Sequence, residues 1–218
     1  MPDWAAIGDE LARNGFRIDS RRPPAAVAGG DINEAWRVDA GSASLFLKTG
    51  PNTAYDMYAA EADGLADLSS ADAVRVPGVV AIGQTNHDAF LALEWLDIGR
   101  PTADSDRRLG EQLAALHRVS TKQFGWKRDN TIGRTPQPNP WTDDWVEFFR
   151  EHRLRFQLDL AAQSGHRGEI ETLGRELSDA LPSFFDGYAV VPSLLHGDLW
   201  GGNRAAIDDE PVIFDPAT

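Results

Sequence analysis

The segment LLHGDLWGGN, residues 194–203, ends an apolar run on a glycine-rich loop. Glycines before and after its aspartate suit neither a helix nor a long strand. The loop therefore presents three polar side chains close together in the chain, His196, Asp198 and Asn203. Their spacing is the sharpest pattern in the sequence, and it indicates a chemical site rather than an ordinary turn.

Asp198 and Asn203 have four residues between them, and Asp215 follows at the end of the apolar run PVIFD. In protein kinases a catalytic base, a metal-binding asparagine and a metal-binding aspartate occur in this order. Phosphoryl transfer needs a group that accepts the proton of a hydroxyl, and hard oxygen ligands that hold Mg²⁺ beside ATP. The three residues therefore predict a phosphoryl-transfer site.

Two hydrolase interpretations of the same loop have less support. A serine-hydrolase triad would require a G-x-S-x-G elbow to accompany His196 and Asp198, and the sequence contains none. A metal hydrolase would require clustered histidines. The other four histidines are scattered along the chain, at His87, His117, His152 and His166.

Weaker signals of the same chemistry precede this loop. The apolar run SLFLK ends on Lys48, and Glu61 lies on the predicted helix that follows, so the two could form an ion pair. The adjacent Gly29 and Gly30 would let backbone N–H groups approach a phosphate closely. A strand-end lysine, a surface glutamate and a simple turn would explain each feature separately. Their order along the chain favours a nucleotide-binding lobe.

Hydrophobic periodicity predicts a sheet-rich first part of the chain. Helical spacing in residues 6–15 ends at a glycine, and apolar residues alternate on both sides of Gly41, which predicts a β-hairpin. A helix is predicted over residues 54–68, and two strands are predicted around a turn at residues 84–88. We place this nucleotide-binding lobe at residues 1–96.

The pattern over residues 97–218 is mainly helical. One helix is predicted within residues 104–120, where leucines share one face. After a proline-rich loop we expect a long helix capped by Thr142, and another helix over residues 167–181. Short strands are expected around the two site aspartates. The chain is thus predicted to be an α+β protein of two lobes with a cleft between them.

Composition excludes several classes of function. The 34 acidic residues outnumber the 21 basic ones, and a net charge of −13 would repel a nucleic acid backbone. The absence of cysteine excludes disulfides, thiolate zinc sites and a cysteine nucleophile, and it agrees with a cytoplasmic location. No segment has the character of a signal peptide or a membrane span, so no membrane partner is expected.

Taken together, the sequence resembles the aminoglycoside-phosphotransferase-like kinases and, within that group, the fructosamine kinase (ketosamine 3-kinase) family. The resemblance runs from residue 29 almost to the end and rests on GGDINEAWRV, FLK, EADGL, LEWL, GEQLAALHR, FGW, LLHGDLWGGN and VIFDPA. It also rests on NTIGRTPQPNPWTDDWVEFFREHRL, residues 130–154. The segment from Phe124 to Leu154 and the Trp-Gly-Gly insert are specific to the fructosamine kinases. The resemblance implies a bilobal protein-kinase-like fold, with a small antiparallel-sheet lobe carrying one key helix and a larger helical lobe.

The family resemblance implies an ATP- and Mg²⁺-dependent kinase that phosphorylates the 3-hydroxyl of a ketoamine, such as a fructosamine, a ribulosamine or another glycated amine. The 3-phosphate would then eliminate and free the amine, which makes the activity one of deglycation or repair. Asp198 would accept the hydroxyl proton, and Asn203 and Asp215 would hold Mg²⁺. The other implied roles are Lys48 on the ATP phosphates, Glu61 positioning Lys48, Gly29 and Gly30 covering the phosphates, Glu94, Trp95 and Leu96 as the hinge that meets adenine, Trp200 against the sugar, and His196 orienting the loop.

Two alternatives share most of these residues. A related phosphotransferase could act on an aminoglycoside, choline or another small alcohol. A strongly acidic pocket would favour a polycationic antibiotic, whereas a less charged pocket lined by tryptophan would favour a sugar. A nucleotide-binding pseudokinase is opposed by the joint presence of Lys48, Asp198, Asn203 and Asp215.

The family continues beyond the last aspartate into further helices. We therefore expect the 218 residues to be part of a longer protein, with an incomplete helical lobe.

Overall fold

The computed structural model describes residues 1–19, 21–27 and 34–218. Gly29 and Gly30, which the sequence places near a phosphate, lie outside the described residues. Within these residues, no helix combines the length and the apolar character that a membrane crossing requires.

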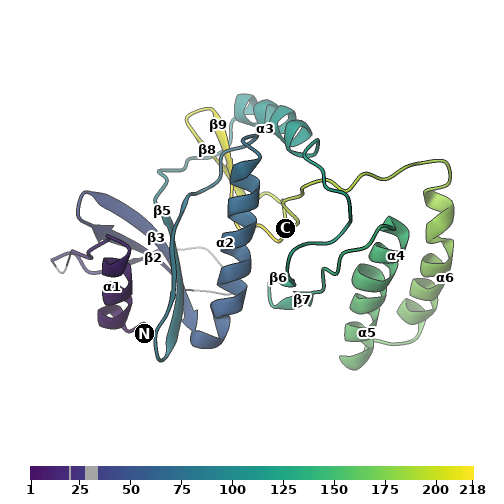
Figure 1. The fold of residues 1–218 in the computed structure, drawn as a ribbon, viewed down its shortest axis with the longest axis horizontal. Coiled ribbons are helices and arrows are strands. Elements are labelled where there is room, and N and C mark those ends of the chain that lie inside the picture. Colours follow the sequence, from purple (N-terminus) through teal and green to yellow (C-terminus); the bar gives the residue numbers. More distant parts are fainter. Residues whose placement is uncertain (20, 28–33) are drawn as a thin grey trace.

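An antiparallel sheet organises the first part of the chain, with strand order β1–β2–β3–β5–β4 (Figure 1). Its strands are β1 (Ala25–Ala26), β2 (Glu34–Ala40), β3 (Ala43–Pro51), β4 (Val79–Gln84) and β5 (Asp88–Glu94). β2 and β3 form the hairpin predicted around Gly41, whose positive φ of 67° favours glycine. β4 and β5 form the second predicted pair of strands.

Helices α1 (Trp4–Arg13) and α2 (Tyr55–Ser70) cover opposite faces of this sheet (Figure 1), and the short 3₁₀ turn η1 (Asn52–Ala54) precedes α2. Successive residues of a strand point to opposite faces. Leu45 and Leu47 of β3 therefore pack in the cluster that contains α1. Phe46 packs in the cluster on the α2 side, and Lys48 reaches Glu61 of α2. The alternation of β3 thus brings a lysine into a buried position beside α2.

The rest of the chain is mainly helical and carries two small hairpins. Its elements are α3 (Ala103–Leu116), β6 (Asn130–Ile132), β7 (Thr135–Gln137), α4 (Trp145–Phe149), the π-helical segment η2 (Arg150–Arg155), α5 (Phe156–Gln163), α6 (Glu169–Phe184), β8 (Arg204–Ile207) and β9 (Glu210–Ile213). α4 and α5 lie beside α6, away from the sheet, whereas the β8–β9 hairpin lies next to α3 (Figure 1). The predicted α+β class is confirmed.

Three details of the helical part differ from the sequence prediction. The proline-rich loop contains the β6–β7 hairpin, and the long helix after it is interrupted by the π-helical segment η2. Asp144, rather than Thr142, caps this helix, because the Asp144 backbone is extended and its Oδ1 accepts the N–H of Glu147 at 2.9 Å. The final strand ends at Ile213, before Asp215, whose φ of 59° is left-handed and cannot continue a strand.

Candidate active site

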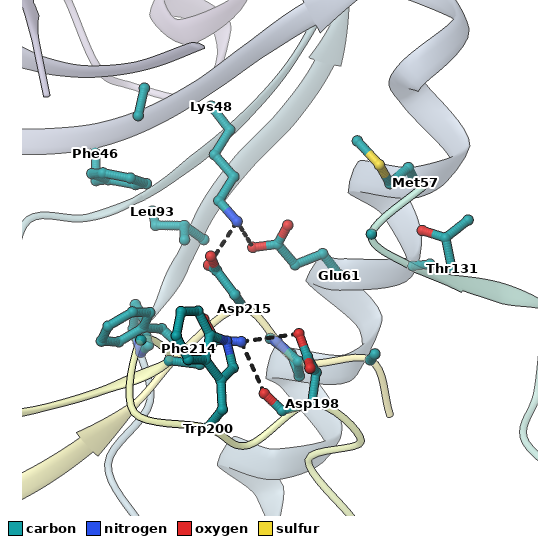
Figure 2. Close-up of a pocket in the computed structure, with 18 of the residues that line it drawn as sticks. Phe46, Lys48, Met57, Glu61, Leu93, Thr131, Asp198, Trp200, Phe214 and Asp215 are labelled. Atoms are coloured by element: carbon teal, nitrogen blue, oxygen red, sulfur yellow. Dashed lines mark hydrogen bonds and ion pairs between the residues drawn. The ribbon is translucent and has the colours of Figure 1, made fainter. Parts of the chain in front are cut away.

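A cleft of about 680 Å³ lies between the sheet, α2 and the C-terminal loops. The sheet contributes Phe46, Lys48 and Leu93 to its wall, and α2 contributes Met57 and Glu61. The loops after residue 197 contribute Asp198, Trp200 and Asp215 (Figure 2), together with Asn203. The structure thus brings together site residues that the sequence places up to 167 positions apart.

Lys48 is only 7% exposed, and its ammonium contacts two carboxylates (Figure 2). Nζ donates to Glu61 Oε1 at 2.6 Å and to Asp215 Oδ1 at 2.7 Å. Burial alone would lower the pKa of Lys48, but the two carboxylates raise it above its usual value. Lys48 is therefore a fixed positive charge, and the ion pair with Glu61 that the sequence suggested is confirmed.

His196 connects the loop of Asp198 to the segment of Asp215. Its Nε2 lies 2.9 Å from the carbonyl oxygen of Phe214, and its Nδ1 accepts the Asp198 N–H at 3.3 Å. These two contacts define a neutral imidazole with its proton on Nε2. Burial lowers the pKa of His196, which keeps the ring neutral. The ring is thus bonded to both segments and does not line the cleft.

Gly197 permits an unusually close approach of these loops. Its φ is +81°, in the left-handed region that favours glycine. A Cβ at this position would collide with the carbonyl oxygen of Ala217. The glycine before Asp198 is therefore required by the backbone that packs against it.

Asn203 is buried, and its amide nitrogen fixes Asp198. Nδ2 donates to the Asp198 carbonyl oxygen at 2.9 Å and to Asp198 Oδ2 at 3.1 Å (Figure 2). Both bonds use only the amide nitrogen. Because Asn203 lines the cleft, its side-chain oxygen remains available to a ligand there. Asp215 uses one carboxylate oxygen for Lys48 and retains the other.

These groups suit a hard divalent cation. Mg²⁺ in nucleotide sites is held by one or two protein carboxylates together with phosphate oxygens and water, rather than by a complete protein cage. The same cleft is lined by the carboxylate of Asp215 and the amide oxygen of Asn203, both hard oxygen donors. Within the described part of the chain, no group of three or more His, Cys, Asp or Glu side chains could hold a metal ion by itself. The donor set therefore fits a metal that arrives with a nucleotide.

The expected hinge lies at the end of β5, and its three residues differ in position. Glu94 and Leu96 line the cleft, whereas Trp95 does not. The Trp95 ring packs against Phe46, 6.5 Å between centroids, and under the guanidinium of Arg37. Any contact of Trp95 with a nucleotide would therefore involve its backbone.

Glu94 is a structural anchor at the rim of the cleft. Its carboxylate accepts the Gly78 N–H at 2.8 Å and pairs with Arg75. Its own N–H donates to the Gly78 carbonyl oxygen at 2.9 Å. These bonds fix the strand end that, by the family resemblance, is expected to meet adenine.

The β6–β7 hairpin is a part of the cleft wall that sequence reasoning missed. It contributes Asn130, Thr131 and Gly133, and Thr131 lies near Met57 of α2 (Figure 2). Across the cleft, Trp200 is 64% exposed and presents a wide apolar face. The prolines of residues 131–141 indicate a loop. Gln137 and Asn139, which lie between these prolines, are the sequence features that could have signalled a buried polar contact.

Comparison with known proteins gives a consistent result. The family model described as "Fructosamine kinase" matches residues 4–218. A "Probable ketoamine kinase" from Synechocystis sp. is 41% identical, over 99% of this chain and 72% of the relative. A chloroplastic "Protein-ribulosamine 3-kinase" from Oryza sativa subsp. indica is 37% identical, over 98% of this chain and 64% of the relative. The chain thus spans roughly two thirds of the length of these relatives.

Solved structures show the same similarity. The crystal structure of a candidate fructosamine-3-kinase from Haemophilus somnus 129PT matches with a TM-score of 0.87 and 29% identity, over 98% of this chain and 72% of that one. An aminoglycoside phosphotransferase matches with a TM-score of 0.61 and 15% identity, over 96% and 70%, which is evidence for the fold alone. The predicted kinase-like fold is confirmed.

Proposed function

Because the chain belongs to the fructosamine kinase family, we propose that it transfers the γ-phosphoryl group of ATP to the 3-hydroxyl of a ketoamine. The observation that carries this proposal is the meeting of Lys48, Glu61, Asp198, Asn203 and Asp215 around one cleft. The resulting 3-phosphate can leave by elimination and free the amine, so the physiological role is deglycation of glycated amines.

Lys48 binds the phosphates of ATP in this proposal. Its charge is fixed by Glu61 and Asp215, and it lies on the wall of the cleft where β3 and α2 meet. The interaction with Glu61 holds the ammonium in place, so little reorganisation is needed when the nucleotide binds. Glu94, Trp95 and Leu96 meet adenine through the backbone at the end of β5, and Gly29 and Gly30 cover the phosphates.

Asp198 is the proposed base. Its Oδ2 is oriented by Asn203, and its backbone N–H is held by His196, so the carboxylate faces the cleft in a fixed position. It accepts the proton of the sugar 3-hydroxyl while the oxygen of that hydroxyl attacks the γ-phosphorus and the bond to the β,γ-bridging oxygen breaks. General-base catalysis of this kind contributes roughly 10²–10⁴-fold to the rate.

Asn203 and Asp215 would hold Mg²⁺ through their side-chain oxygens, and the ion would neutralise charge on the phosphates during transfer. Asn203 serves two purposes, because its nitrogen fixes Asp198 and its oxygen remains for the metal. Asp215 likewise serves two purposes, because its Oδ1 accepts from the Lys48 ammonium and its other carboxylate oxygen would bind the metal.

The charge of the cleft favours a ketoamine over a polycationic aminoglycoside. Glu61 and Asp215 pair with Lys48, and Glu94 pairs with Arg75. Asp198 is the fourth acidic residue of the described cleft wall, and it has a chemical role of its own. Trp200, which is exposed and apolar, is the proposed contact of the sugar ring.

An ATP-consumption assay tests this proposal, with a fructosamine, a ribulosamine, kanamycin and choline as substrates. We expect turnover on a ketoamine and a product that ³¹P and ¹³C NMR identify as the 3-O-phosphate. Turnover on kanamycin or choline alone would contradict the substrate assignment but leave the catalytic residues in place. ATP binding without turnover on any substrate would indicate a pseudokinase.

A further inference from the structure

Three amide side chains near the β6–β7 hairpin are buried, and the proposed chemistry does not use them. Asn130, Gln137 and Asn139 are 8%, 7% and 3% exposed. An amide buried without hydrogen-bond partners is costly, so such groups are found where their bonds are made. Their partners include one another and the backbone of the segment that carries Asp215.

The three amides form a continuous set of hydrogen bonds. Gln137 Nε2 and Asn139 Nδ2 both donate to Asn130 Oδ1, each at 2.9 Å. Gln137 Nε2 also donates to the carbonyl oxygen of Ala217 at 3.2 Å, and Asn130 Nδ2 donates to that of Thr218 at 2.6 Å. At the far end, Arg153 of η2 donates to Asn139 Oδ1 at 2.6 Å. We call Asn130, Gln137, Asn139 and Arg153 the amide network.

The amide network reaches the site through the backbone of one residue, Ala217. The N–H of Ala217 donates to the carbonyl oxygen of His196 at 2.8 Å, and its C=O accepts from Gln137. Ala217 is thus held on one side by the loop that carries Asp198 and on the other by the hairpin. Gly197 packs against the carbonyl group of Ala217, so a shift of Ala217 would be transmitted to the neighbouring Asp198.

Asp215 depends on this support because its backbone is not held by a strand. β9 ends at Ile213, and Asp215 has a left-handed φ of 59°, which is unfavourable for a residue with a side chain. Strained conformations of this kind persist only where surrounding contacts fix them. Contacts on both sides of Asp215 fix this backbone. Phe214 is hydrogen-bonded to Asn203 and His196 before it, and Ala217 is hydrogen-bonded to His196 and Gln137 after it.

We propose that the amide network, through Gln137 and Ala217, positions Asp215 for metal binding and is therefore a positioning element of the reaction. The inference rests on the proposed function, in which Asp215 is a ligand of Mg²⁺. Gln137 does not line the cleft, so it acts on the metal only through the backbone that it holds.

The test is calorimetric titration of ADP into the protein at a series of Mg²⁺ concentrations, with Gln137→Met as the variant. This change keeps a long side chain but removes both donated bonds. Loss of a supporting bond behind a metal ligand weakens metal affinity by about 10–100-fold, so we expect the Mg²⁺ concentration at half-maximal enhancement of ADP binding to rise by about tenfold. ADP affinity without Mg²⁺ should stay within about twofold of that of the unaltered protein.

A matched control separates positioning from a general loss of stability. Ser105 is 1% exposed and belongs to the capping box of α3, away from the network. Ser105→Ala removes a buried hydrogen-bonding group and should leave the Mg²⁺ dependence unchanged. Asn139→Ser is a second, milder variant that removes the contact with Asn130, and we expect a shift in the same direction by about threefold.

The outcomes distinguish this inference from the proposed function. If the unaltered protein binds ADP with no Mg²⁺ dependence, the metal role of Asp215 fails, and the inference with it. Suppose instead that the unaltered protein binds ADP in a Mg²⁺-dependent way, and that Gln137→Met and Asn139→Ser fold and show the same Mg²⁺ dependence. The proposed function then stands, and the amide network has only a structural role. A shift of equal size in Ser105→Ala would also overturn the inference.

Discussion

Lys48 illustrates how individual residues build the site. A lysine that is only 7% exposed would be unfavourable in the core without carboxylate partners. Glu61 on α2 and Asp215 on the C-terminal loop supply them, at 2.6 Å and 2.7 Å. The same ion pairs that allow Lys48 to be buried therefore place a cation beside the carboxylate that is proposed to bind the metal.

Substitutions of the two site aspartates should have different effects. Asp198→Ala removes the proposed base, so we expect kcat to fall by about 10²–10⁴-fold with ADP affinity nearly unchanged. Asp215→Ala should instead weaken Mg²⁺-dependent nucleotide binding. Steady-state kinetics and calorimetry on both variants provide the measurement. Full activity in Asp198→Ala would show that another group accepts the proton.

His196 should make the stability of the fold sensitive to pH. Burial lowers its pKa, so in the unfolded chain it takes up a proton near pH 6.5 while in the folded chain it is still neutral. Its contribution to stability is thus present above about pH 6.5 and is lost as the pH falls, by at most about 1.4 kcal/mol per pH unit.

Urea unfolding between pH 7.5 and pH 5.5 would measure this effect, with His196→Gln as the control. The slope of the unfolding free energy against pH should be smaller in the variant. Equal slopes in the two proteins would contradict the assignment to His196.

At the scale of elements, α2 is fixed to the helical part of the chain as well as to the sheet. Trp126 Nε1 donates to Asp67 at 2.8 Å, and Arg128 pairs with Asp63 at 3.0 Å. These contacts lie on the same helix as Glu61. The position of Glu61, and through it that of Lys48, therefore depends on residues just before the β6–β7 hairpin.

Trp126→Phe should weaken this connection. The change retains a buried ring but removes the hydrogen bond to a carboxylate, so we expect the free energy of unfolding to fall by about 1–3 kcal/mol. Trp141 is 48% exposed, and Trp141→Phe is the matched control, with an expected change within about 0.5 kcal/mol. Equal effects of the two substitutions in urea unfolding would show that the Asp67 contact contributes nothing specific.

The elements differ in how well the sequence predicts them. The hairpin around Gly41 and helix α2 follow from alternation and helical periodicity, which are local signals. The β6–β7 hairpin does not, because its strands have three residues each and its prolines suggest a loop. Its amides are buried by contacts with Ala217 and Thr218, some 80 or more residues away. Only tertiary structure reveals such contacts.

The candidate site, like the fold, could be predicted from the sequence only in part. Asp198, Asn203 and Asp215 could be named because their spacing reflects phosphoryl-transfer chemistry, and Lys48 because it ends an apolar run. The contact between Lys48 and its second carboxylate partner, Asp215, could not be predicted, because the two residues lie 167 positions apart in the sequence. The metal, base and hinge roles, and the boundary at residue 96, stay predictions.

At the scale of the whole molecule, one hydrophobic cluster crosses the predicted lobe boundary. Tyr58 and Leu65 of α2 share it with Leu109 and Leu116 of α3 and with Ile213 of β9. The ion pair between Lys48 and Asp215 also joins the two sides. Lobes that share a core should not unfold independently, because exposing one removes the packing of the other.

Ile213→Ala tests this coupling. Ile213 is fully buried, so the substitution should lower the free energy of unfolding by about 2–5 kcal/mol. Tryptophan fluorescence and far-UV circular dichroism in urea should report one coincident transition in both proteins, displaced as a whole in the variant. Ile170, which is 49% exposed on α6, gives a control substitution to alanine with a change of about 1 kcal/mol or less. Two separate transitions, or a shift in only one probe, would mean that the lobes fold independently and that the cleft is held together by Lys48 and Asp215 rather than by a common core.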